Sequence, residues 1–316
     1  MHIVKSHLLQ SLILLTVAVF TAGCEKVHPV PDFVEVLPIV FDGLYDHDWY
    51  LLDSAGRRMN LWQGSWELNT AEGFVYKGQR FDTPLLCRKR AVEIVAGQHP
   101  YDEDTLTVPV SGSPKQVTAF EIIELPSRKI FICGGMINGA RLDSSSLAET
   151  WLYDPDKRRI VPGPDMKCGR SQHRLTLLKD GRVLISGGLD GDNVLRSVEV
   201  FDPVAGSITA LNDLSLPRAS HGAVQLHNGL LLIVGGITDE KFSDANDNVT
   251  STVELMDLSS MSSKLVGRML IERTSPIILA VGDCQAVVAG GIHMNESYDY
   301  RFVRDAEIMK PLAAAK

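Results

Sequence analysis

The stretch that decides the fold is Asp180-Gly181-Arg182-Val183-Leu184-Ile185-Ser186-Gly187-Gly188, in which a turn signal and an apolar run lead into a glycine pair. Arg170 and His173 precede this stretch, and Ser-Val-Glu-Val-Phe-Asp-Pro at residues 197–203 follows it. The same order of residues returns from Arg218 and His221 through a second glycine pair to Val-Glu-Leu-Met-Asp at residues 253–257. The chain is therefore built from an internal repeat. Such a repeat indicates the fold directly, whereas function must be inferred from other residues.

Two markers keep the same period along the chain. The glycine pairs stand at intervals of 53, 48 and 55 residues: Gly134 and Gly135, Gly187 and Gly188, Gly235 and Gly236, Gly290 and Gly291. An acidic position follows each pair, at Glu149, Glu199, Glu254 and Glu307. Residues 91–94 place Glu93 in the same slot one period earlier, and residues 74–78 take the preceding glycine slot with one glycine lost. We therefore predict five units, of which the first is degenerate.

Each unit is expected to hold four short strands, A to D. In the third unit we place strand A at residues 175–178, B at 183–186, C at 198–201 and D at 208–211. Asp180-Gly181 is a hairpin signal between A and B. The glycine pair at the end of B suits a close backbone approach or a positive φ angle. The last unit ends after strand C, so we expect an N-terminal segment, residues 34–40 or 49–53, to supply its fourth strand and to remove an open edge.

These features resemble the kelch repeat over about 240 residues, counted from the degenerate first unit to the chain's end. The residues that carry the resemblance are the glycine pairs, the Arg-x-x-His openings and the strand ends with Glu before Asp-Pro, as at Glu149 with Asp154-Pro155 and Glu199 with Asp202-Pro203. The regular downstream tryptophan of the family is missing. The resemblance implies an all-β, kelch-type β-propeller of about five four-stranded blades, or six if the N-terminal segment forms a partial blade, with the ring closed by an N-terminal strand.

The N-terminus predicts export and a lipid anchor. An apolar run at residues 8–22 is short for a membrane span and ends in Phe20-Thr21-Ala22-Gly23-Cys24. This end resembles the lipobox of bacterial lipoproteins, although Thr21 stands where the family usually has Leu. We expect a signal peptide over residues 1–23, a linker over 24–33 that starts at lipidated Cys24, and the propeller over 34–316. Alternatives are an ordinary signal peptide or a retained anchor. Glu25 stands where many lipoproteins of two-membrane bacteria carry the aspartate that retains them in the inner membrane. For a source with two membranes, the resemblance therefore implies the outer membrane of the cell envelope, facing the periplasm or the cell surface.

Composition limits the partners and the metal chemistry. The net charge of −8 argues against a non-specific nucleic-acid partner, which would need a basic face. Apart from Cys24, the cysteines are Cys87, Cys133, Cys168 and Cys284, and their spacing matches no metal site. We expect these residues to be small buried thiols. If the chain is exported, an oxidising environment would also allow them to form disulfide bonds.

Two interpretations apply to the polar residues that recur at the openings, Arg170, His173, Arg218, His221 and Arg273. As a binding rim, their guanidinium groups would clamp a carboxylate or an acidic sugar. As scaffold, each arginine would pair with the repeated glutamate of its unit. Repetition favours the scaffold, since binding sites break symmetry. The same reasoning argues against Glu93, Glu149, Glu199, Glu254 and Glu307 as catalytic acids.

The loops between strands B and C are long, polar and unequal, and they share an end of the unit with the loops between D and A. They carry candidate rim carboxylates, at Asp190, Asp192, Asp239, Asp244 and Asp247. These residues lack the spacing of a full calcium-ligand set, so we expect no metal and no cofactor.

The chain contains no nucleophile elbow, zinc-binding His-Glu-x-x-His or phosphate loop. We therefore expect a non-enzymatic module that binds an unknown protein or glycan through the loop end. The alternative is a periplasmic sugar-acid epimerase, which the similarity to kelch-type N-acetylneuraminate epimerases implies, with Arg and His moving a proton. A structural envelope protein without a small ligand is a third possibility.

Overall fold

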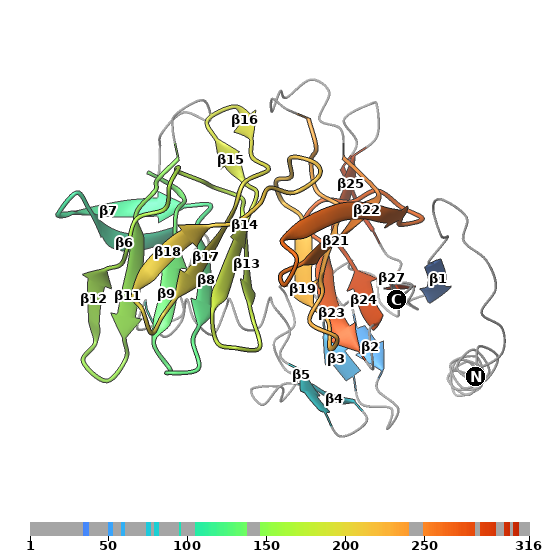
Figure 1. The fold of residues 1–316 in the computed structure, drawn as a ribbon, viewed down its shortest axis with the longest axis horizontal. Helices are drawn as coiled ribbons and strands as arrows, with labels where there is room; N and C mark the ends of the chain where they lie inside the picture. Colours follow the sequence, from blue (N-terminus) through green and yellow to red (C-terminus); the bar gives the residue numbers. More distant parts are fainter. Residues whose placement is uncertain are drawn as a thin grey trace, which may run out of the picture. The chain divides into compact units, whose positions relative to one another are not determined.

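The computed structural model (Figure 1) describes residues 105–137, 146–239, 249–281, 285–294, 300–303 and 306–309, residue 95, and five short N-terminal strands. All of these belong to one compact unit, Asp32–Lys316. The predicted signal peptide, the lipidation site Cys24 and almost all of the predicted linker precede this unit, and they lie outside the described residues, as do Glu93, Asp244 and Asp247. No helix among the described residues is long and apolar enough to cross a membrane.

The protein is all-β, and its main elements are antiparallel sheets of four strands. Three of them follow the chain in simple meander order. The first consists of β8 (Glu121–Glu124), β9 (Ile130–Cys133), β11 (Thr150–Asp154) and β12 (Arg159–Pro162). The second consists of β13 (Arg174–Leu177), β14 (Val183–Ser186), β17 (Val198–Asp202) and β18 (Ser207–Ala210). The third consists of β19 (Gly222–Gln225), β20 (Leu231–Val234), β21 (Thr252–Asp257) and β22 (Ser262–Arg268).

The strands predicted for the third repeat unit are confirmed. Strand B was expected at residues 183–186, and β14 has those bounds. β13, β17 and β18 start or end within one residue of the other three predicted strands. Gly181 has a positive φ of 86°, as the Asp-Gly hairpin between the first two strands requires.

The fourth four-stranded sheet draws its outer strand from the N-terminus. It consists of β23 (Ile277–Val281), β24 (Gln285–Ala289), β27 (Ala306–Met309) and β1 (Val34–Leu37). β1 runs antiparallel to β27, with Val34 opposite Met309 and Leu37 opposite Ala306. The prediction that an N-terminal segment supplies the missing strand is thus confirmed for residues 34–40. The other candidate segment contains β2 (Tyr50–Leu52), which pairs with β3 (Arg58–Asn60) instead.

The degenerate first unit differs from its prediction. β4 (Phe74–Tyr76) pairs with β5 (Gln79–Phe81) in a two-stranded sheet, so the residues expected to end strand B lie in a hairpin, and residues 91–94 lie outside the described residues. A three-stranded sheet consists of β6 (Thr105–Val110) and β7 (Ser113–Thr118), which precede the first four-stranded sheet in the chain, and β10 (Met136–Ile137), which follows β9. Four sheets with the four-strand pattern are present in the described part of the chain, and a ring that closes on itself is not seen there.

The hydrophobic core lies between consecutive sheets. Phe131 of β9 stacks on Phe201 of β17 with ring centroids 4.2 Å apart, and both belong to a cluster shared by the first two four-stranded sheets. Leu184 of β14 and Ile233 of β20 belong to the next cluster along the chain. The β6–β7 hairpin packs on the first four-stranded sheet through its own cluster, which contains Trp151. Each of the first three four-stranded sheets therefore buries one face against the sheet before it and the other against the sheet after it, and the fourth packs against the third.

The first strands of the four sheets, β8, β13, β19 and β23, lie next to one another in chain order (Figure 1). A non-glycine residue with positive φ precedes each of them: Ala119 (51°), Gln172 (49°), Ser220 (51°) and Ser275 (48°). The Gln172 N–H donates to the Ala119 carbonyl (3.2 Å), the Ser220 N–H to Gln172 (2.9 Å) and the Ser275 N–H to Ser220 (2.6 Å). This row of backbone hydrogen bonds joins the openings of consecutive sheets.

Two further hairpins follow glycine pairs. β15 (Leu189–Asp190) pairs with β16 (Asn193–Val194), and β25 (Ile292–Met294) pairs with β26 (Tyr300–Phe302). Single bridges join Ser171 to Leu189, Ala219 to Ile237 and Thr274 to Ile292. The start of each of these loops is thereby attached to the opening of its own sheet.

Candidate functional site

The three recurring arginines pair with the recurring glutamates inside the protein. Arg170 Nη2 lies 2.5 Å from Glu199 Oε1, Arg218 Nε lies 3.1 Å from Glu254 Oε2, and Arg273 Nη2 lies 2.5 Å from Glu307 Oε1. The arginine side chains are 0% exposed in all three pairs. The scaffold interpretation of the arginines is therefore confirmed, and their guanidinium groups are not presented to solvent as a clamp.

Each arginine also holds the glycine pair of its own sheet. Its Nη1–H donates to the carbonyl of the first glycine, at 2.8 Å for Gly187, 2.9 Å for Gly235 and 3.1 Å for Gly290. In every case the arginine stands 17 residues before that glycine. A single guanidinium group thus joins the opening of the sheet to its second and third strands, which explains why this residue type recurs.

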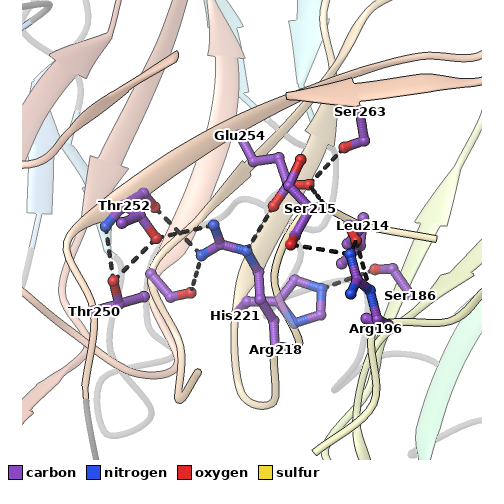
Figure 2. A network of polar contacts seen from close by, with 11 residues as sticks. Ser186, Arg196, Leu214, Ser215, Arg218, His221, Thr250, Thr252, Glu254 and Ser263 are labelled. Carbon is purple, nitrogen blue, oxygen red and sulfur yellow. Dashed lines mark hydrogen bonds and ion pairs between the residues drawn. The ribbon is translucent and has the colours of Figure 1, made fainter. Parts of the chain in front are cut away.

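The network around Arg218 and Glu254 satisfies almost every polar atom that it buries (Figure 2). Arg218 Nη2 donates to Thr252 Oγ1 at 2.9 Å. The Glu254 carboxylate accepts from the Ser215 N–H and from Ser263 Oγ, the latter at 2.6 Å. A buried ion pair gains stability only when its remaining donors and acceptors are satisfied in this way.

The glycine pairs lie where consecutive repeats touch. The second glycine of a pair donates its N–H to the arginine carbonyl of the next repeat, as Gly188 does to Arg218 at 2.7 Å. Gly187 and Gly188 have φ angles of 57° and 104°. A Cβ on Gly187 would lie 2.1 Å from the Arg218 carbonyl oxygen. Both properties expected of the pair, close approach and positive φ, are confirmed.

Glu149 does not occupy the position of the other repeated glutamates. Glu199, Glu254 and Glu307 lie opposite Ile185, Ile233 and Val288 of the second strand, and the residue in that register of the first four-stranded sheet is Trp151, opposite Ile132. The matching arginine position, one residue before Thr118, holds Val117. Val117 and Trp151 are buried in one cluster, and Trp151 Nε1–H donates to the Pro109 carbonyl at 2.9 Å. An apolar pair replaces the ion pair in this sheet, as buried ion pairs allow.

The two histidines of the openings are buried between sheets. His221 Nε2 makes a 2.8 Å hydrogen bond with Ser186 Oγ (Figure 2). Burial, together with the positive charges of Arg218 and Arg174, lowers the pKa of His221 to about 3. Both ring nitrogens of His173 are buried without a hydrogen-bond partner, and desolvation followed by the Arg170 charge lowers its pKa well below the usual value. Both imidazoles are therefore neutral at physiological pH.

The candidate carboxylates of the loops have different surroundings. Asp190 Oδ1 accepts the Ser146 N–H at 3.1 Å, which ties two consecutive loops together, whereas Asp192 is exposed and Asp239 is half-buried. No group of three or more His, Cys, Asp or Glu side chains in the described ranges is arranged to hold a metal ion. The loop end thus offers individual polar residues, and no metal centre is apparent among those described.

The free cysteines of the described chain are Cys133, which is buried, and Cys168, which is half-buried. Burial raises the pKa of the Cys133 thiol, as expected of a small buried thiol. Cys168 Sγ accepts from Arg170 Nη2 at 3.4 Å and so belongs to an arginine network. Cys87 and Cys284 lie outside the described residues.

The sequence reasoning missed one polar group, formed by Arg174, Thr176 and His221 with Ser186. Arg174 lies opposite Ser186 in the sheet, and Thr176 lies on the same face two residues further along β13. A signal for this group exists in the repeat. The positions that correspond to Arg174 in the other sheets hold Glu121, Gly222 and Ile277, so a positive charge occurs at this position in the second sheet alone.

No protein-family model and no curated protein sequence matches this chain, so the geometry above carries the functional argument by itself.

Proposed function

We propose that this chain is an exported, lipid-anchored module of the cell envelope that binds a protein or a glycan through the loop end of a kelch-like propeller. One observation carries the proposal. The charged residues that recur in the repeats pair with one another inside the protein, whereas the loops that differ between repeats remain for binding. The repeated charges are paired internally at Arg170–Glu199, Arg218–Glu254 and Arg273–Glu307. What differs from one unit to the next is the loop that follows each glycine pair, and variable loops on a rigid scaffold are where such folds bind.

Several features support a propeller arrangement. Consecutive sheets bury clusters between them, their first strands are neighbours, and β1 completes the last sheet next to the chain's C-terminal strand. Joining the two ends of the chain in one sheet is the usual way in which such a ring avoids an open edge.

The bases of the loops are held firmly while their tips differ. The bridges at Leu189, Ile237 and Ile292 and the hydrogen bonds of the glycine pairs fix where each loop leaves its sheet. Asp192 and Asn193 at the tip of the β15–β16 hairpin are exposed. Burial argues against the alternative of a sugar-acid epimerase, because the arginines and histidines that would bind the substrate are buried.

The test replaces residues 239–248 by a short Gly-Ser linker in the purified chain. Capture of envelope proteins, and binding to an immobilised set of bacterial glycans, should be lost or strongly weakened. A matched control shortens residues 258–261, the turn between β21 and β22, and should bind as the parent does. Equal binding by both variants and the parent would rule out the loop end as the binding surface.

The lipid anchor has a separate test. Labelling cells with a clickable fatty acid should mark the wild-type chain but leave Cys24→Ser unlabelled. Labelling that persists in Cys24→Ser would contradict anchoring at this residue.

A further inference from the structure

Three buried polar atoms of the second and third four-stranded sheets and their openings have no hydrogen-bond partner: Arg174 Nε, Thr176 Oγ1 and His221 Nδ1. Leaving a donor unsatisfied in a protein interior costs free energy, so such atoms are rare and each needs an explanation. A bound acceptor would satisfy the donors that lie on these facing elements.

The contacts between sheets place these atoms together. Arg174 and Thr176 share one face of β13 with their cross-strand partners Ser186 and Leu184. That face is turned toward the next sheet, because Leu184 belongs to the cluster of Ala223 in β19, and Ser186 Oγ lies 2.8 Å from His221 Nε2. His221 directly precedes β19, and the Arg174 charge acts on its ring.

All three groups can donate a hydrogen bond. Arg174 Nε–H and the Thr176 hydroxyl are donors, and when His221 Nε2 accepts from the Ser186 hydroxyl, His221 Nδ1 carries the proton and donates as well. Arg174 makes no ion pair with a described carboxylate, whereas Arg170, Arg218 and Arg273 each have one. A positive charge accompanied by further donors on facing elements suits an anionic oxygen ligand.

We propose that Arg174, Thr176 and His221 form a binding site for a small oxyanion, with a carboxylate as its ligand. Thr176 and His221 are buried, at 6% and 3% exposure, and Arg174 is half-buried. The site occurs in one repeat alone, because the positions equivalent to Arg174 in the other sheets hold Glu121, Gly222 and Ile277. It is separate from the loop tips and does not depend on their proposed role.

The experiment titrates the purified chain with sodium formate, the smallest carboxylate, against sodium chloride at constant ionic strength near neutral pH. The urea midpoint of unfolding reports binding, because a ligand of the native state raises it. Formate should raise the midpoint of the wild type. Arg174→Gln should weaken the apparent affinity by about tenfold or more, and Thr176→Val should weaken it by a smaller factor.

Arg182→Gln is the matched control, because Arg182 is an exposed arginine of the same sheet that pairs with Asp180, and its response to formate should equal that of the wild type. Thr176→Val preserves the shape of the side chain, so it keeps the test decisive if Arg174→Gln does not fold. If formate does not raise the urea midpoint of the wild type, only water accepts hydrogen bonds from these donors. That result, or an equal response in wild type, Arg174→Gln and Thr176→Val, would overturn the proposal.

Discussion

Arg218 and Glu254 show how one residue pair organises a repeat. Both side chains are fully buried, and removing water from two charges is costly unless the partners and the surrounding donors compensate for it. The Gly235 carbonyl, Thr252 Oγ1, the Ser215 N–H and Ser263 Oγ provide that compensation. The pair therefore stabilises the sheet only as a complete network, and losing one member should cost more than the pair contributes.

Glu254→Gln leaves Arg218 as an unpaired buried charge. We expect it to lower the free energy of unfolding by about 3–5 kcal/mol, measured by urea denaturation. Asp180→Asn is the control, because the Asp180–Arg182 pair is exposed and its loss should cost only about 0–1 kcal/mol. Similar costs for the two variants would contradict the scaffold role of the buried pair.

Gly188→Ala tests the close approach between repeats. Its Cβ would lie 2.7 Å from both His173 Cβ and the Ser171 carbonyl oxygen, at a φ of 104°. We expect a loss of about 2–5 kcal/mol, from left-handed strain and overpacking together. Gly206→Ala has a φ of 64° with nothing within 4 Å, so it should lose only about 1–2 kcal/mol in the same urea denaturation measurement. A smaller loss at Gly188 than at Gly206 would show that the contact is loose.

The buried histidines predict sensitivity to acid. His173 and His221 have pKa values below the usual 6.5 in the folded state, so the unfolded chain binds protons first as the pH falls. Their contribution to stability is complete above the unfolded pKa and is lost as the pH falls through 6.5 toward the folded pKa, which is about 3 for His221.

His173→Phe should remove one of these acid-sensitive groups. Phe120 occupies the equivalent position of the preceding repeat, so the packing accepts this side chain. Urea denaturation below pH 6.5 should show a dependence of unfolding free energy on pH that is shallower by about 1.4 kcal/mol per pH unit than in the wild type. Identical slopes would mean that His173 does not contribute.

At the level of elements, the pairing of β1 with β27 joins the two ends of the compact unit. Glu35 lies opposite Ile308 in this ladder, within the separation that a disulfide can bridge. Glu35→Cys combined with Ile308→Cys should therefore form a disulfide under oxidation, detected by mass spectrometry of the digested protein. Glu35→Cys combined with Ser262→Cys places the second thiol in another sheet and should not cross-link. A cross-link in the control alone would contradict the strand pairing.

The sequence predicted the four-stranded units well because each signal is local. Asp180-Gly181 specifies a hairpin, and the apolar residues of β14 specify a strand buried on both faces. The arginine–glutamate pairing also followed from repetition. Glu149 was placed wrongly because spacing in the sequence ignores register, and the register of β11 puts Trp151 in that position. Arg174 went unnoticed because its importance depends on what faces it across two sheets, which no local pattern contains.

Across the whole molecule, residues that the repeats share differ in role from residues that one repeat has alone. The shared arginines Arg170, Arg218 and Arg273 are each paired with a glutamate inside the protein, whereas Arg174 occurs in one repeat alone and makes no ion pair with a carboxylate of the described residues. By this argument the repeat provides the rigid scaffold, and binding depends on the departures from it.

The same substitution at Arg218 and at Arg174 tests that distinction most directly. Equilibrium urea unfolding should show that Arg218→Gln loses about 3–5 kcal/mol, because it leaves Glu254 buried without its cation. Arg174→Gln should stay within about 1 kcal/mol of the wild type, because no protein carboxylate among the described residues depends on it. A large loss in Arg174→Gln, or an Arg218→Gln variant as stable as the wild type, would contradict the account.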